Sequence, residues 1–403
     1  MSKSKYVLYF HCTLYKESSA GVITVHKIID YFNKNNQPAY IILQNETIGA
    51  EGYKLPNYDN GLITPLLKEH ELDLHIKEDL IPIVFYPDTI NNNPLKASNI
   101  CRMIFYYDGI YSGKTSLNKS YKEGIIFFSK LIQEKANISN ALYQNIVSFP
   151  VAKTEIVDYI DNNNFKKSDI FFYDGKFTKN FKGVIPKEIA SYSKIDRGEK
   201  NSLSQTAIFE KLKKAKLLHV FEDSAIIYEA LLLGCPVNIH PDGYFHKNKP
   251  LAYNEVKLYG SMSKRYPSED DIEIAMNEII DFKEEYKMWC KFGETNLRDL
   301  NKNFKYHSQK FSQENITKIR NNIRQSFMYI DRYSNNDHNQ RFLVFIKNIA
   351  IKYIVSILYK TYIIFIKTNF GKNYIKKYCL LLYYYLPTSL KKIITNYIAK
   401  IKS

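Results

Sequence analysis

The chain has 403 residues, of which 45% are hydrophobic, and carries a formal net charge of +16. This length and apolar content are ample for packed cores and predict two domains with an appendage. Five scattered cysteines without a Cys-x-x-Cys pair argue against a disulfide framework or a zinc site and favour a reducing compartment. No signal peptide precedes the first apolar run. We therefore expect a protein of the cytosol or of the cytosolic face of a membrane.

The positive charge is concentrated near the C-terminus. Residues 341–403 contain twelve Lys or Arg and no Asp or Glu, which accounts for twelve of the sixteen excess charges. A nucleic-acid-binding protein more often carries its basic surface on a folded domain. The charge here belongs to an appendage, so we expect no nucleic-acid partner.

The first 43 residues have the pattern of a doubly wound α/β domain. An apolar, aromatic run over 5–11 predicts a strand, and a loop of small residues over 15–21 follows it. Apolar residues between Val22 and Phe32 recur at helical spacing, and 39–43 predicts a second strand. Gly21, near the start of this helix, permits close approach of a ligand to the backbone. A tight turn explains the glycine equally well.

A polar loop follows the strand predicted over 83–86. Asp88 lies just past the C-terminal end of that strand, where open α/β sheets bind ligands. A carboxylate there can act as the general base for an acceptor hydroxyl. The alternative is an Asp that caps a local turn. We expect a helix or a strand over residues 97–105 and another strand over residues 124–128. We expect an inter-domain hinge at residues 150–151.

The second half repeats the pattern of strand, turn and helix. A strand over 169–173 runs into a turn, a helix is predicted over 205–216, and a short apolar strand covers 217–221. Asp223 and Ser224 then occupy the position of a helix N-cap. The N-terminus of that helix, with the Ser224 hydroxyl, can dock a phosphate. Glu229, more than one turn along, can accept hydrogen bonds from a ribose diol. The alternative is an ordinary βαβ unit with an N-cap Ser and a surface Glu.

This last segment resembles the donor-binding segment of GT-B-fold glycosyltransferases. In that family an acidic residue, a small residue and Glu-Ala precede a Gly-x-Pro-Val turn, as Glu229-Ala230 and Gly234-Cys235-Pro236-Val237 do here. The large retaining group has seven residues between two glutamates. Here six residues separate Glu222 from Glu229, and Asp223-Ser224 replaces a glycine-containing turn. Retaining stereochemistry therefore does not carry over.

A second segment resembles GT-B enzymes of bacterial surface-polysaccharide loci. Their pattern is a strand, Tyr-Pro-Glu, a short loop, Asn-Pro-Leu and a helix that bears an arginine. Asp88 takes the place of the acid here, Asn93-Pro94-Leu95 is retained, and Arg102 takes the arginine position. Arg102 then faces the inter-domain cleft or pairs with Asp108.

The same resemblance implies two cations at the donor diphosphate. Lys176 follows Gly175 after the strand over 169–173, as a lysine does in the family, and lysine is a compact point charge suited to phosphate. Arg197 takes the second cationic position and can bind phosphate bidentately. A solvated loop residue is the alternative for each of them.

The resemblance covers about residues 1–300 and implies a GT-B fold, with two Rossmann-like domains facing across a cleft. Residues 1–150 would form the acceptor domain and 151–300 the donor domain. A charged helix over 269–304, with Ala275, Ile279, Ile280 and Phe282 inward, would return to the first domain. The implied reaction transfers a sugar from a nucleotide-sugar to a growing, lipid-linked surface glycan of the lipopolysaccharide, O-antigen or capsule type. We expect no cofactor and no bound metal.

Residues 301–340 are predicted to be a helical connector, and 341–403 a basic amphipathic tail. No charge-free stretch between 341 and 368 reaches the roughly 18 residues of a membrane span. Arg341, Lys352, Lys360 and Lys367 fall on one arc of a helical wheel, which favours binding to an anionic membrane surface. This predicts a peripheral protein on the inner face of the cytoplasmic membrane.

Two alternatives stay open at this point. The tail can instead be a helical oligomerisation arm, which would make the protein a homo-oligomer. The whole chain can instead be a non-catalytic peripheral membrane protein that keeps the fold, since the segment at 222–224 departs from the pattern of the enzymes.

Overall fold

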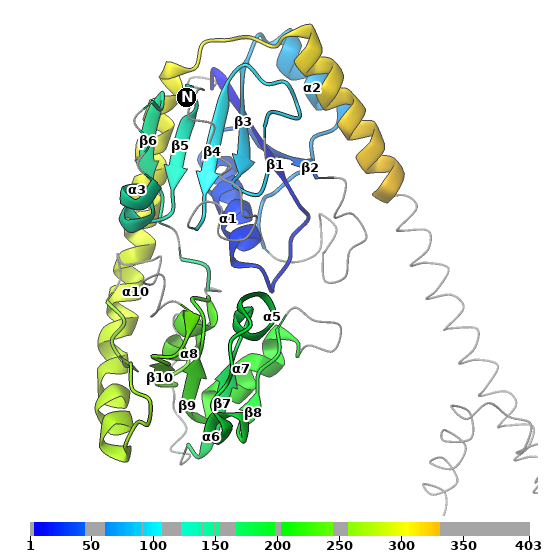
Figure 1. The fold of residues 1–403 in the computed structure, drawn as a ribbon. Coiled ribbons are helices and arrows are strands. Elements are labelled where there is room, and N and C mark those ends of the chain that lie inside the picture. The colour runs from blue at the N-terminus through cyan, green and yellow to red at the C-terminus, as the bar shows by residue number, and fades with distance from the viewer. Residues whose placement is uncertain are drawn as a thin grey trace, which may run out of the picture. The chain divides into compact units, whose positions relative to one another are not determined.

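The computed structural model describes residues 4–44, 61–90, 92–106, 122–136, 138, 140–148, 150–152, 156, 159, 167–197, 203–244 and 257–330. These residues form two parallel β-sheets with helices packed on them (Figure 1). The predicted tail over 341–403 and Asp108 lie outside the described residues.

The first sheet has six strands in the order β2-β1-β3-β4-β5-β6, and every pair is parallel. The strands are β1 (Tyr6–Cys12), β2 (Ala39–Leu43), β3 (Ile81–Pro87), β4 (Ile100–Ile104), β5 (Gly124–Phe127) and β6 (Tyr143–Ile146), with helices α1 (Ala20–Lys34), α2 (Glu69–Lys77) and α3 (Lys130–Ala136). The central strands are almost wholly apolar because parallel strands are buried on both faces.

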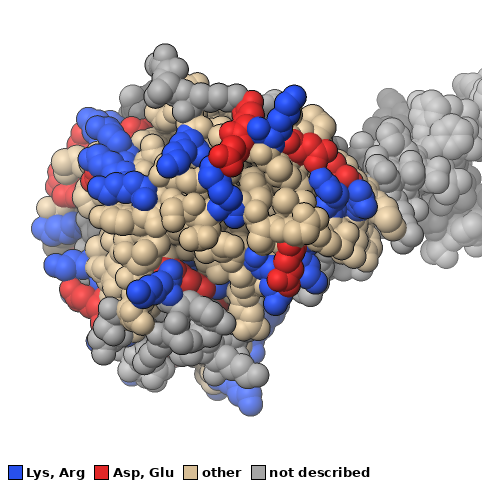
Figure 2. Space-filling view, turned by 90° about the horizontal axis from the view of Figure 1, so that it is seen from above, with Lys and Arg blue, Asp and Glu red and all other residues tan. Residues whose placement is uncertain are grey.

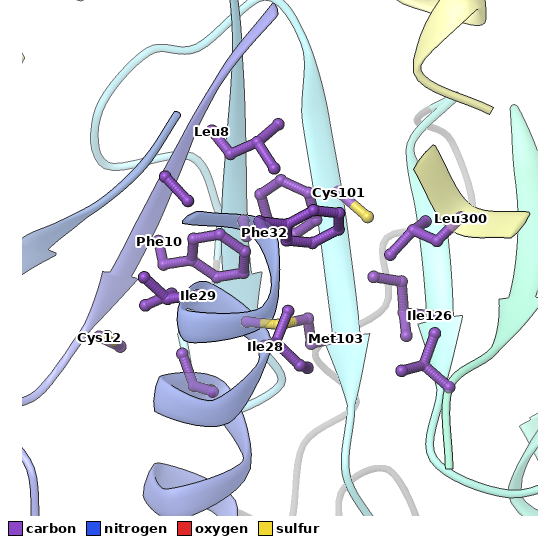
Figure 3. Packing of buried hydrophobic residues seen from close by; sticks show 14 of the residues in the cluster. Leu8, Phe10, Cys12, Ile28, Ile29, Phe32, Cys101, Met103, Ile126 and Leu300 are labelled. Carbon is purple, nitrogen blue, oxygen red and sulfur yellow. The ribbon is translucent and has the colours of Figure 1, made fainter. Parts of the chain in front are cut away.

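The two faces of β1 belong to two different clusters of buried side chains. Leu8 and Phe10 point to the face that α1 covers, where they pack with Ile28, Ile29 and Phe32 (Figure 3). Val7 and Tyr9 point to the opposite face, which is covered by α2 and by a helix over residues 313–330. This alternation is the two-residue repeat of a strand between two helical layers.

The second sheet has five parallel strands in the order β11-β10-β9-β7-β8. The strands are β7 (Asp169–Tyr173), β8 (Ser193–Lys194), β9 (Ala215–Val220), β10 (Val237–Ile239) and β11 (Ser261–Met262), with helices α5 (Phe177–Phe181), α6 (Lys187–Ala190), α7 (Gln205–Lys214) and α8 (Ile226–Leu232). Every residue of α8 is buried, so this helix lies inside the domain.

Each sheet has a point at which the order of its strands reverses. In the first sheet, β2 lies on one side of β1 and β3 lies on the other side. In the second sheet, β8 lies on one side of β7 and β9 lies on the other side. Ligands of open α/β sheets bind beyond the carboxyl ends of the strands at such points. A ligand-binding site is therefore expected at the loops after β1, β3, β7 and β9.

Helix α10 (Glu269–Asn303) joins the two cores. Its first half packs into the second core through Ile279, Phe282 and Tyr286, whereas Leu297 and Leu300 lie in the first core. This confirms the predicted return of the helix, which runs alongside both sheets in Figure 1. The prediction was wrong for Ile280, which is 69% exposed. The inward face of the helix follows 272, 275, 279, 282 and 286, and position 280 lies outside that stripe.

The chain crosses between the cores a second time at 148–152, where side chains of both domains hold it. The ammonium of Lys27 on α1 donates to the carbonyl oxygens of Pro150 (3.1 Å) and Ala152 (2.8 Å). From α10, the Trp289 indole donates to the Ser148 hydroxyl at 2.7 Å. The hinge predicted at 150–151 is thus a tightly bonded segment.

Two sequence expectations need correction. Residues 100–104 form a strand, so Arg102 lies on β4 and not on a helix as the resemblance implied. The helical connector predicted over 301–340 does contain a helix, over 313–330, but its Ile319 and Ile323 are buried in the core beside β1, so this helix is part of the first domain. The apolar positions 319 and 323 are one turn apart, and this spacing turns both side chains toward the sheet.

Charges of both signs are mixed on the face of the molecule seen in Figure 2. Ion pairs on the described surface include Arg320 with Asp73 and Arg324 with Glu69, between the helix over 313–330 and α2. Among the residues that the structure describes, no helix combines the length and apolarity that a membrane crossing requires.

The burial of the helix over 313–330 gives a test of its place in the fold. Ile319 is 0% exposed, so Ile319→Ala should lower the free energy of unfolding by about 2–4 kcal/mol through the cavity it leaves. The matched variant Ile280→Ala removes the same atoms from an exposed site and should stay within about 0.5 kcal/mol of wild type. Urea denaturation measures both, and equal effects would contradict the packing described here.

Candidate functional site

The predicted donor residues meet at the carboxyl edge of the second sheet. Gly175 and Lys176 follow β7, Arg197 follows β8, and Glu222 and Ser224 follow β9. Because β7, β8 and β9 are neighbours and parallel, their carboxyl ends lie at one edge. This is the reversal point of the sheet, so the fold itself brings these side chains together.

A buried ion pair between Arg197 and Glu229 forms the centre of this edge. The two terminal nitrogens of the Arg197 guanidinium donate to the two oxygens of the Glu229 carboxylate, at 2.8 and 2.9 Å. The side chains are 7% and 2% exposed. This bidentate geometry is among the stronger hydrogen-bonded charge pairs in proteins. Two residues predicted to touch the donor separately are thus bonded to each other.

Further groups surround the pair from both domains. The Gln205 amide at the start of α7 donates to Glu229 Oε1 at 3.1 Å, and its own oxygen is buried and has no hydrogen-bond partner within the described part of the chain. Arg197 also donates to the carbonyl oxygen of Glu17 at 3.3 Å. Glu17 lies in the loop between β1 and α1, so Arg197 connects the second domain to the first. Burial raises the pKa of Tyr15 in the same loop to about 12.

The structure shifts the predicted N-cap by one residue. Helix α8 begins at Ile226, and its N-cap is Ala225 without a side-chain hydrogen bond. Ser224 lies one residue before the cap, where its hydroxyl is hydrogen-bonded to Tyr173 and its carbonyl oxygen accepts from Ile227 N–H at 3.1 Å. Residue 225 has helical backbone angles and no side-chain oxygen that could cap the helix. Asp223 and Ser224 remain partly exposed beside the turn after β7.

Glu222 is a functional candidate that the sequence analysis did not select. Its carboxylate accepts the backbone N–H of Lys176 at 2.6 Å and lies against Gly175, whose φ is +51°. A Cβ at position 175 would overlap this carboxyl group, so the turn requires glycine here. Burial raises the pKa of Glu222 to about 7, whereas the Lys176 N–H and ammonium lower it. Such perturbed carboxyls concentrate at functional sites.

At the first sheet, the structure brings Asp88 and Gly21 to one place. Asp88 lies past the end of β3 and accepts the N–H of Phe105 at 3.1 Å, and a Cβ on Gly21 would touch the same Phe105 ring at 3.9 Å. Both residues therefore lie at the reversal point between β1 and β3. Asp88 is partly exposed, so its predicted role as base stays a prediction.

Asn93 and Arg102 instead hold the loop that carries Asp88. Asn93 accepts from the Tyr86 hydroxyl at 2.9 Å and from Ala97 N–H at 2.9 Å. Arg102 is 2% exposed, pairs with Glu123 at 3.1 Å and donates to the Ile90 carbonyl oxygen at 2.6 Å. The expectation that Arg102 faces a cleft needs correction, because a buried guanidinium is satisfied within the domain.

His11 is a second candidate that the sequence analysis missed. It lies near the carboxyl end of β1, and its ring packs edge to face with Tyr86. Among the described residues, neither its buried Nδ1 nor the buried hydroxyl of Thr13, just past the strand, has a hydrogen-bond partner. Burial lowers the pKa of His11 to about 4, so the ring is neutral at pH 7. A histidine within an apolar strand gave no signal in the sequence.

Among the described residues, no group of three or more His, Cys, Asp or Glu is arranged to hold a metal ion. The cysteines in these ranges, Cys12, Cys101, Cys235 and Cys290, are free thiols.

The two parallel sheets with a returning helix α10 have the GT-B architecture that the sequence predicts.

Comparisons with known proteins begin with two negative results. No protein-family model matches the sequence, and no curated protein matches it. Solved structures to which the chain is similar include glycosyltransferases. Spinosyn forosaminyltransferase SpnP is 11% identical, with a TM-score of 0.38 over 75% of this chain and 99% of that chain. The glycotransferase of kitacinnamycin is 10% identical, with a TM-score of 0.40 over 75% of this chain and 99% of that chain.

The glycosyltransferase BGT of phage T4, solved with its UDP-glucose substrate, is 10% identical, with a TM-score of 0.34 over 74% of this chain and 97% of that chain. At this level of identity, and with TM-scores below 0.5, the similarities say nothing about the donor or the acceptor of this chain. Those questions depend on the side chains described above.

The ion pair predicts an asymmetry between single and double variants. Glu229→Ala leaves a buried guanidinium unpaired and should lower the free energy of unfolding by about 3–5 kcal/mol. The double variant Arg197→Met with Glu229→Leu removes both charges and should be more stable than Glu229→Ala alone. Urea denaturation of wild type, Arg197→Met, Glu229→Leu and the double variant measures the coupling. A double variant less stable than either single variant would contradict the buried pair.

Glu222 predicts a pH-dependent effect on stability. Its pKa in the folded protein, about 7, lies above its ordinary value of 4.5, so the folded state binds the proton more tightly. The carboxyl therefore reduces stability as pH rises from 4.5 through 7. Glu222→Gln keeps an acceptor for Lys176 N–H but cannot ionise. Relative to wild type, it should be more stable by no more than about 1 kcal/mol at pH 5 and by up to about 3 kcal/mol at pH 8.

Urea denaturation at pH 5, 6, 7 and 8 measures this difference. The control is Glu210→Gln, since Glu210 is an exposed carboxylate of α7 in the same domain. A difference between Glu222→Gln and wild type that is the same at every pH would show that Glu222 does not titrate in this range.

Proposed function

We propose that the protein is a glycosyltransferase that moves a sugar from a nucleotide-sugar to a growing, lipid-linked surface glycan. One observation carries the donor half of this proposal. Lys176, Arg197, Ser224 and Glu229, chosen from sequence, converge at the reversal point of the second sheet, and Arg197 reaches the β1–α1 loop of the first domain. A residue that bonds both domains at the carboxyl edge suits a substrate held between donor and acceptor halves.

Each donor residue has a proposed task. Lys176 is exposed at the tip of the turn after β7 and supplies a point charge to the diphosphate. Arg197 supplies a second positive charge that is already oriented. Glu229 is 1% exposed, so we propose that it orients Arg197, in place of the direct ribose contact expected from sequence. Cations fixed in advance stabilise the charge that develops on a leaving diphosphate, so we expect the reaction to need no bound metal.

The acceptor half of the reaction is assigned to the first domain. Asp88 is proposed to take the proton of the acceptor hydroxyl. The acceptor oxygen then forms the new bond to the anomeric carbon, and the nucleoside diphosphate leaves with the electron pair of the bond that breaks. Asp88 is supported by its position past β3 beside Gly21, at the first reversal point.

The lipid-linked acceptor and the membrane location rest on sequence alone. Residues 341–403 carry twelve cations among apolar residues, which supports binding to anionic lipid on the inner face of the cytoplasmic membrane. A membrane-bound acceptor of the lipopolysaccharide, O-antigen or capsule type would explain why a transferase carries such a tail.

A thermal-shift panel of UDP-, dTDP-, GDP- and ADP-sugars tests the proposal. A ligand at about a hundred times its dissociation constant should stabilise the wild type by about 2.7 kcal/mol. Lys176→Ala should lose most of the shift, because it removes a cation from the diphosphate. Lys187→Ala removes an exposed lysine of α6 and should keep the shift.

Release of the nucleoside diphosphate from the ligand that binds then tests turnover. No shift with any nucleotide-sugar, from a well-folded sample, would overturn the donor site and favour the non-catalytic membrane protein. Binding without turnover on glycan acceptors would keep the site and reject the activity.

A further inference from the structure

The contact between Glu222 and the turn after β7 links the two strands on either side of the reversal point. Glu222 follows β9, and its carboxylate accepts Lys176 N–H from the turn after β7 at 2.6 Å. Its carboxyl group fills the space that a side chain at Gly175 would occupy. The backbone that presents Lys176 is therefore held in place by one buried carboxyl group, which is only 8% exposed.

Charged and titratable groups face Glu222 from each neighbouring segment. From β7 and its turn come Tyr173, Asp174 and Lys176, and Asp223 is its neighbour in the chain. Asp174 is itself paired with Lys194 of β8 at 3.1 Å. The pKa of Glu222 is raised by burial, by Asp223 and by Asp174, and lowered by Lys176. Lys176 is thus the cation in this set that favours the ionised carboxylate.

We propose that Glu222 is a positioning residue for the turn that carries Lys176, and that its carboxyl takes up a proton when an anionic diphosphate docks at that turn. This inference rests on the proposed donor site. A docked diphosphate places negative charge beside the carboxylate and engages the one cation that favours its ionised form. Both effects favour the protonated carboxyl.

The turn keeps its hydrogen bond when Glu222 is protonated. A neutral carboxyl group still offers an oxygen to the N–H of Lys176. Because the pKa of Glu222 is about 7, the free protein is divided between the two forms near neutral pH. Binding of the donor would then draw one proton from solution, and its affinity would fall as pH rises.

Isothermal titration calorimetry with the nucleotide-sugar that gives the largest thermal shift tests the proposal. The phosphates of a nucleotide-sugar do not titrate near neutral pH, so a change in affinity reports on the protein. If the docked anion raises the pKa of Glu222 by about one unit, wild-type affinity should be about fivefold weaker at pH 8 than at pH 6. Glu222→Gln should bind with less than about a twofold change between these values.

Two controls separate Glu222 from other titrating groups. Glu210→Gln removes an exposed carboxylate of the same domain and should keep the fivefold change. Titrations at pH 7 in buffers of different ionisation enthalpy should give uptake of a fraction of a proton per site in wild type and almost none in Glu222→Gln.

The outcomes are distinguishable. Wild type that binds nucleotide-sugars with the same affinity at pH 6 and pH 8 would overturn this inference and leave the proposed donor site intact. Equal pH dependence in wild type and Glu222→Gln would also overturn it. Wild type that binds no nucleotide-sugar at either pH would overturn the proposed function and this inference with it.

A test without any ligand addresses the positioning role. Gly175→Ala should lower the melting temperature strongly in wild type, because the new methyl group overlaps Glu222 and the backbone there has a positive φ. In a Glu222→Ala background the overlap is gone, so the same substitution should lower the melting temperature less. An equal loss in both backgrounds would show that Glu222 does not hold the turn.

Discussion

The buried ion pair between Arg197 and Glu229 is the interaction on which the proposed site depends. Removing two charges from water is costly, and the two parallel hydrogen bonds together with Gln205 offset that cost. The pair fixes three segments that are distant in sequence: the one after β8, helix α8 and, through Glu17, the loop after β1. Replacing a buried ion pair by an apolar pair of similar volume is often neutral or stabilising. The proposed function gives these charges a use beyond stability, which is to bind an anion.

Glu222 shows the same relation between stability and function on a smaller scale. A carboxyl that is buried so far that its pKa rises to about 7 reduces the stability of the fold at neutral pH. Glutamine in its place would keep the hydrogen bond to Lys176 without this cost. Asn93 and Arg102 form a contrast, because their hydrogen bonds to Tyr86, Ile90 and Glu123 lie within the first domain and stabilise the loop that carries Asp88.

The sequence predicted the strands well, because buried parallel strands are short apolar runs. Residues 39–43 and 169–173 were predicted with the bounds that β2 and β7 have in the structure. The sequence did not predict side-chain contacts between residues that are distant in the chain. The residues around Arg102 do not predict its ion pair with Glu123. The residues around Lys176 do not predict the hydrogen bond from its N–H to the Glu222 carboxylate. The helix over 313–330 was read as a connector because it has few apolar residues, although two of them complete the core beside β1. The sequence thus predicted which residues gather at the carboxyl edge of the second sheet, where we propose the donor site, but not which of them bond to one another.

Hydrogen–deuterium exchange with and without the nucleotide-sugar that binds is the most direct test of the central claim, that Arg197, Glu229 and the turn at Lys176 form the donor site. Binding should protect backbone amides in the turn at 174–177, in the segment at 222–226 and in the loop at 13–19, because Glu222 holds the turn through the N–H of Lys176 and Arg197 is bonded to the loop at Glu17. Peptides of the first core, such as those of β5, serve as the internal reference and should not change. Protection confined to other segments, or none with a ligand that demonstrably binds, would contradict the claim.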